Sequence, residues 1–132
     1  MNSVVRKVLV FVDNDDDEIK IFEKVCEKAK LPFEVKTFKS GQSFLDYIAN
    51  AIKKQLVMPE HILIDINMPG QNGFETVEEL KSMKEWKNDS RITFFTNSTW
   101  EKDKKVAQDM DAGFMTKPEN INDYIIFLKS IA

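Results

Sequence analysis

The chain has 132 residues, the size of one domain with one hydrophobic core. Its composition is 42% hydrophobic and 31% charged, and the net charge of −3 comes without a basic stripe, which argues against a nucleic-acid surface. No apolar stretch approaches the ~20 residues that span a bilayer, so we expect no membrane segment and no signal peptide. Cys26 is the only cysteine and His61 the only histidine, which excludes an internal disulfide and multi-histidine metal sites. We therefore expect a cytoplasmic protein.

The first part of the chain alternates strand-like and helix-like patterns. Residues 7–12 form a β-branched apolar run of strand length. A helix is expected from Asp16 onward, capped by Asp16 or Asp17. A second strand is expected over 33–38, and Ser40 is a good cap for a second helix. The apolar residues at helical spacing in the first helix are Ile19, Ile21, Phe22, Val25, Cys26 and Ala29.

The same alternation continues to the end of the chain. An apolar run predicts a buried third strand over 61–66, and the turn-rich segment 67–73 separates it from a third helix. The remaining expected elements are strands at 91–96 and 113–116 and helices at 99–110 and 121–131.

Five repeats of strand and helix predict a doubly wound α/β fold, with a mostly parallel five-stranded sheet covered by helices on both faces. We expect one domain over 1–132. Ligands of such folds lie beyond the carboxyl ends of the strands, near the switch point in strand order. The residues that end the strands are therefore the candidate site, and they are Asp13, Asn14, Asp65, Thr96 and Lys117.

These strand ends suggest a hard divalent cation and phosphoryl chemistry. The acidic segment after the first strand has no glycine-rich loop and would repel the phosphates of a nucleotide. Carboxylates are the ligands that Mg²⁺ prefers, commonly one or two of them with a phosphoryl oxygen. Asp65 can itself accept a phosphoryl group as an aspartyl phosphate. The Lys117 ammonium and the Thr96 hydroxyl are suited to neutralising its oxygens.

Four segments resemble the receiver domain of two-component response regulators. They are "VFVDNDDDEI" (10–19), "LIDINMPGQNGFE" (63–75), "FFTNS" (94–98) and "FMTKP" (114–118). They cover nearly the whole chain in the family's order, and the second of them is the most specific. The resemblance implies the strand order 2-1-3-4-5.

The resemblance also implies a role for each matching position. Asp65 would be the phosphoacceptor, and the Lys117–Pro118 peptide bond would be cis, a form found mainly before proline. Thr96 and Phe114 would move on phosphorylation, and Thr96 and Lys117 would contact the phosphoryl oxygens. The implied Mg²⁺ ligands are Asp13 through water, Asn14, Asp65 and the backbone carbonyl of Asn67.

Asn14 departs from the family, which usually has an acid that binds the metal directly at this position. The amide oxygen of Asn14 can still coordinate, but one negative charge is lost, so we expect weaker Mg²⁺ binding. Asp15 or Asp16 is a candidate to compensate. By themselves, Asp16, Asp17 and Glu18 fit a solvated first helical turn better than a site.

Several other residues have simpler interpretations. His61 is expected to be a polar surface residue at the start of a strand, and Cys26 a core residue. Trp100 suits either an interface anchor or packing on a neighbouring helix. Phe114 fits the core as well as it fits a switch.

The function that these expectations favour is a receiver that takes a phosphoryl group onto Asp65 from a histidine kinase or a phosphotransfer protein, with Mg²⁺ bound. It would not be an enzyme in the usual sense. It would signal to a downstream protein through the surface of the fourth helix, fifth strand and fifth helix, as a monomer or weak homodimer without an output domain. One alternative is a degenerate receiver that acts as an interaction module without phosphate. Another is a phosphatase of the haloacid dehalogenase type, although Asn67 stands where those enzymes want a second acid.

Overall fold

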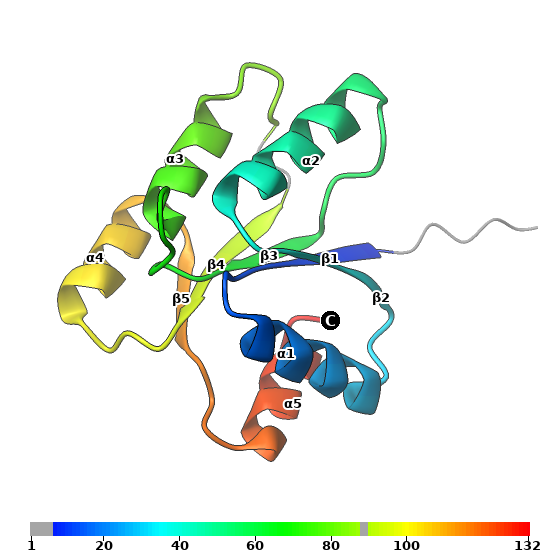
Figure 1. Cartoon of the computed structure of the whole chain (residues 1–132), viewed down its shortest axis with the longest axis vertical. Helices are drawn as coiled ribbons and strands as arrows, with labels where there is room; N and C mark the ends of the chain where they lie inside the picture. The colour runs from blue at the N-terminus through cyan, green and yellow to red at the C-terminus, as the bar shows by residue number, and fades with distance from the viewer. Residues whose placement is uncertain (1–6, 88–89) are drawn as a thin grey trace, which may run out of the picture.

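A computed structural model describes residues 7–87 and 90–132 of the chain. Residues 1–6, part of the predicted domain, lie outside the described residues. The described elements alternate strand and helix from beginning to end (Figure 1). They are β1 (Lys7–Val12), α1 (Asp16–Ala29), β2 (Phe33–Phe38), α2 (Gly41–Lys53), β3 (His61–Ile64), α3 (Gly73–Ser82), β4 (Arg91–Thr96), α4 (Glu101–Asp109), β5 (Gly113–Thr116) and α5 (Ile121–Ser130).

The five strands form one parallel sheet in the order β2-β1-β3-β4-β5, as predicted. Helices α1 and α5 pack on one face of the sheet, and α2, α3 and α4 lie on the other (Figure 1). The chain winds outward from β1 in both directions, so the strand order reverses between β1 and β3. In doubly wound folds this switch point opens a crevice at the carboxyl ends of the strands.

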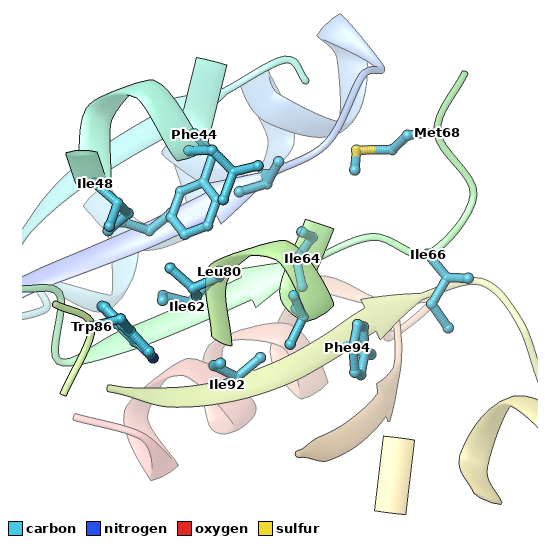
Figure 2. Packing of buried hydrophobic residues seen from close by; sticks show 14 of the residues in the cluster. Phe44, Ile48, Ile62, Ile64, Ile66, Met68, Leu80, Trp86, Ile92 and Phe94 are labelled. Atoms are coloured by element: carbon cyan, nitrogen blue, oxygen red, sulfur yellow. The ribbon is translucent and has the colours of Figure 1, made fainter. Parts of the chain in front are cut away.

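Each face of the sheet carries its own apolar core. Because side chains alternate along a strand, Val10 and Val12 point toward α2, while Leu9 and Phe11 point toward α1 and α5. Figure 2 shows the larger core, where Phe44 and Ile48 of α2 face Ile62 of β3. The central strands are apolar on both faces, as parallel sheets require.

Side chains at the helix starts fix where the helices begin. Ser40 caps α2 as predicted, by accepting from the N–H of Ser43 at 3.1 Å. The cap of α1 is Asp15, one residue before the expected position, because its carboxylate accepts from the N–H of Asp17 at 2.8 Å. The prediction of Asp16 or Asp17 as the cap was therefore wrong.

The solvent exposure of three side chains corrects or completes what the sequence predicts for them. His61 is buried rather than exposed, because β3 is a central strand and the Nε2 atom of His61 lies 2.8 Å from the hydroxyl of Thr93. Ile21 is 48% exposed, because it lies on the outer side of α1. Trp100 is 69% exposed, so it does not pack against a neighbouring helix.

The helix and strand ends differ from the expected ones by a few residues at most. Strand β3 ends at Ile64, so Asp65 follows the strand instead of lying within it. Helix α4 begins at Glu101, two residues later than predicted. Within the described ranges, no helix is long and apolar enough to cross a membrane.

Candidate functional site

The predicted site residues surround one cavity at the carboxyl edge of the sheet. The cavity has a volume of about 240 Å³ and is lined mainly by polar side chains. Its position at the ends of β1, β3, β4 and β5 is the switch point of the sheet. The residues that line it are Asp13, Asn14, Asp15, Glu18, Asp65, Asn67, Thr96, Asn97 and Lys117.

Asp13 is the most deeply buried of the acids, with 1% of its surface exposed. Its backbone N–H donates to the carbonyl of Phe38 at 3.0 Å, which ties the end of β1 to the end of β2. Carboxylate oxygen Oδ1 accepts from the N–H of Asp15 at 2.9 Å, and Oδ2 accepts from Lys117 Nζ at 2.6 Å. Two fixed donors therefore hold a buried charge in one orientation.

Asp65 follows β3 and faces the same cavity. Its N–H donates to the carbonyl of Val12 at 2.9 Å, so the two acid-bearing strand ends lie next to each other. Burial raises the pKa of the Asp65 carboxyl, while the charge of Lys117 and the hydroxyl of Thr96 lower it in part. Its carboxylate therefore lies where a bound cation would stabilise the ionised form.

The first residue of α3, Gly73, must be a glycine because it packs against the backbone of Asp65. A Cβ atom at Gly73 would collide with the backbone carbonyl of Asp65 and lie 3.0 Å from the Cα atom of Ile66. The N–H of Gly73 donates to the carbonyl of Ile66 at 2.9 Å. A capping box of Asn72 and Glu75 closes the start of α3. Together these contacts fix the loop that carries Asp65.

Lys117 lies among three carboxylates. Its Nζ atom is 2.6 Å from Asp13, 3.5 Å from Glu18 and 4.0 Å from Asp65. Burial lowers the pKa of Lys117, but the hydrogen bond to Asp13 and the charges of the three acids raise it by more. The side chain of Lys117 is therefore a protonated ammonium at neutral pH.

The Lys117–Pro118 peptide bond is not cis. The residues that the structure describes contain no cis peptide bond, and both partners of this bond are among them. The trans form is the lower in energy even before proline, by about 0.5–1 kcal/mol. Lys117 reaches Asp13 from this trans backbone, so the predicted cis-proline at Pro118 was wrong.

Thr96 and Phe114, the two predicted switch residues, lie on neighbouring strands. Thr96 ends β4, is fully buried and accepts from the N–H of Ser98 at 3.3 Å. Phe114 on β5 is partly buried against the larger core, and the Lys104 ammonium lies 6.0 Å from the centre of its ring. Their movement on phosphorylation stays a prediction.

Two contacts connect β5 with the loop after β4. The N–H of Lys117 donates to the carbonyl of Thr96 at 2.7 Å. The hydroxyl of Thr116 donates to the carbonyl of Ser98 at 3.1 Å, and the hydroxyl of Ser98 lies 2.7 Å from the carboxylate of Asp103 in α4. The end of β5 is thus hydrogen-bonded to the segment that leads into α4.

The acids that were candidates to compensate for Asn14 are engaged elsewhere. Asp15 borders the cavity, but its Oδ1 atom caps α1. Asp16 forms an exposed ion pair with Lys39 at 2.6 Å. Asp16 is therefore paired outside the cavity, whereas Asp15 keeps its charge at the cavity wall while it caps the helix.

Glu18 is the residue that the sequence analysis missed. It was expected in a solvated turn, yet it lines the cavity with 27% of its side chain exposed and contacts Lys117. Helical spacing is the sequence signal that indicates an inward-facing Glu18, because Phe22 and Val25 follow it by four and seven residues on the same face of α1 and are buried. Asn97 also lines the cavity and was not singled out.

The donor set fits a magnesium ion that keeps several waters. Within the described part of the chain, no group of three His, Cys, Asp or Glu residues forms a closed metal cage. The predicted ligands Asp13, Asp65, Asn14 and Asn67 all border the cavity, and so supply two of its carboxylates and two of its side-chain amides. Mg²⁺ sites commonly use one or two carboxylates plus water, and a cavity of about 240 Å³ has room for several waters.

Solved structures of response regulators have the same fold. One is the response regulator RPA3017 in red light signalling of R. palustris, at 22% identity and a TM-score of 0.82, over 95% of this chain and 90% of that one. Another is the Mn²⁺-bound form of response regulator Rcp1, at 20% identity and 0.77, over 95% and 91%. A third is the phosphorylated cyanobacterial phytochrome response regulator RcpA, at 24% and 0.75, over 96% and 91%.

Sequence comparison gives the family. A search among curated proteins found no match to the chain. The family model of the response regulator receiver domain matches residues 8–128, which include every residue that lines the cavity. The chain therefore belongs to the response regulator receiver domain family.

Proposed function

We propose that the chain accepts a phosphoryl group on Asp65 from the phosphohistidine of a histidine kinase or a phosphotransfer protein. Receiver domains interact with such partners in general. The observation that carries the proposal is the convergence of Asp65, Thr96 and Lys117 on one acidic cavity. Asp65 supplies the nucleophile, and its side chain is reached from the cavity.

The transfer needs little from the protein beyond position and charge. A carboxylate oxygen of Asp65 forms a bond to phosphorus while the bond from phosphorus to the donor imidazole nitrogen breaks. The electron pair of that bond stays on the imidazole. The Lys117 ammonium and the Thr96 hydroxyl stand at the cavity wall to stabilise the phosphoryl oxygens.

Receiver domains bind Mg²⁺ as a family property. We propose that Asp13, Asn14, Asp65 and the backbone carbonyl of Asn67 hold it here, with water as the remaining ligands. The ion would neutralise charge on the phosphoryl oxygens when bound. The Rcp1 structure is of a Mn²⁺-bound form, which supports the choice of a divalent cation.

The signal would leave by protein contact on the surface of α4, β5 and α5. Phosphorylation adds nearly two negative charges beside Thr96 and Lys117. The segment from Trp100 to the end of α5 carries three exposed apolar side chains that suit a partner interface, Trp100 at 69%, Ile126 at 65% and Ile121 at 44%. We propose a cytoplasmic monomer or weak homodimer that binds a downstream protein there when phosphorylated.

A second candidate is a receiver that signals without phosphate. Asn14 favours it, because a neutral side chain stands at this position where the family usually has an acid. In that case the unmodified chain would bind its partner through the same surface.

Intact mass after incubation with Mg²⁺ and acetyl phosphate separates the two candidates. A gain of one phosphoryl group that requires Mg²⁺, is lost in Asp65→Ala and is kept in the exposed-site control Asp17→Ala supports the first. No gain at high Mg²⁺ supports the second. Turnover of a generic phosphomonoester would instead indicate a phosphatase.

A further inference from the structure

We infer that Glu18 supplies the negative charge that Asn14 withholds from the cation site. The inference rests on the proposed function, and it concerns how this particular chain keeps a divalent cation in its cavity. Glu18 lines the cavity from α1, on the side where Lys117 enters from β5. The sequence alone predicts that Glu18 is a solvated residue of the first helical turn.

The geometry gives Glu18 a fixed place in the site. Its Oε2 atom lies 3.5 Å from the Lys117 ammonium, which also contacts Asp13 at 2.6 Å and Asp65 at 4.0 Å. The Lys117 side chain is 5% exposed, and that of Glu18 is 27% exposed. One buried cation thus joins three carboxylates that come from α1, β1 and β3.

The charge balance of the cavity depends on Glu18. The carboxylates of Asp13, Asp15 and Asp65 that border the cavity, less the ammonium of Lys117, sum to a charge of about −2. Glu18 brings the total to about −3. An acid at position 14 with a neutral residue at position 18 would give the same total, so Glu18 supplies the charge that Asn14 withholds.

Glu18 need not bind the ion directly to have this effect. A carboxylate acts through space, and its contact with Lys117 also reduces the repulsion between the ammonium and an arriving cation. At a separation of about 6 Å and in a water-like dielectric, one negative charge strengthens the binding of a divalent ion about tenfold.

The test is Mn²⁺ binding, measured by calorimetry and by electron paramagnetic resonance on the unphosphorylated chain. Glu18→Gln is expected to weaken binding about tenfold, because it removes the charge and keeps the shape. Asp17→Asn is the matched control, since it removes an acid from the same turn at an exposed position outside the cavity. It is expected to change binding less than twofold.

The rescue variant gives the sharper result. Asn14→Asp combined with Glu18→Gln is expected to restore wild-type affinity, because the cavity again holds the same net charge. Equal affinities of Glu18→Gln and Asp17→Asn would overturn the inference, as would the absence of rescue or of any Mn²⁺ binding by wild type. Failure of the proposed function has a different signature, which is a wild-type chain that binds Mn²⁺ yet gains no phosphoryl group on Asp65.

Discussion

Replacing Lys117 by an uncharged residue should lower the free energy of unfolding far more than replacing an exposed lysine whose ammonium lies at the same distance from a carboxylate. Lys117→Met leaves Asp13 buried with one hydrogen-bond donor instead of two, and leaves it uncompensated beside Asp65. Breaking a buried ion pair by losing one partner costs about 3–5 kcal/mol. The chain offers a matched control, because Lys39 and Asp16 also lie 2.6 Å apart but are 69% and 63% exposed. Lys39→Met should cost only about 0.2–1 kcal/mol.

Urea unfolding without divalent cations, followed by circular dichroism, measures both variants. With an m-value of about 2 kcal/mol per molar, a loss of 4 kcal/mol lowers the midpoint for Lys117→Met by about 2 M. Asp13→Asn combined with Lys117→Met should recover part of that loss, because a carboxylate no longer lies buried without its partner. If Lys117→Met and Lys39→Met lose stability equally, burial does not set the strength of the Lys117 contacts, and the account of the site given above fails.

Three further predictions concern residues outside the ion cluster. Burial, with the charge of Arg91, lowers the pKa of His61 to about 4, so the unfolded chain binds more protons between pH 6.5 and 4. When the pH falls from 7 to 5, wild type should therefore lose about 2 kcal/mol more of its unfolding free energy than His61→Gln does, as measured by urea unfolding. Equal losses in the two proteins would contradict this. Gly73→Ala should cost about 1–3 kcal/mol and reduce phosphorylation, because the new Cβ displaces the backbone of Asp65; unchanged thermal unfolding and phosphorylation would contradict it. Burial raises the pKa of Cys26 to about 12, so iodoacetamide should leave the folded chain unmodified at pH 8 and alkylate it in urea; equal rates in both states would contradict it.

The strand ends were predictable because short local sequence patterns mark them. Each central strand is a short apolar run, and the first polar residue after it, such as Asp13 or Asp65, lies at the carboxyl edge. Parallel order then brings these residues together without further information. The same logic located Lys117, although the contact with Asp13 joins positions 104 residues apart.

Other parts of the site depend on how elements pack. The neighbouring acids Asp17 and Glu18 face different directions on α1, and only the folded chain brings Lys117 within 3.5 Å of Glu18. The burial of His61 follows from the central place of β3, which local polarity does not reveal. The bond before Pro118 is trans, whereas the resemblance to the family implied a cis bond.

Hydrogen bonds between β5 and the loop after β4 join the segments that carry Thr96 and Lys117, the two residues that we propose to contact the phosphoryl group. Lys117 is tied through its N–H to the carbonyl of Thr96, and Thr116 is tied to Ser98. A displacement of the Thr96 hydroxyl by a phosphoryl group would therefore act on the backbone next to Lys117 and, through the hydrogen bond between Ser98 and Asp103, on the first turn of α4. We therefore expect the start of α4, next to exposed Trp100, to respond to phosphorylation.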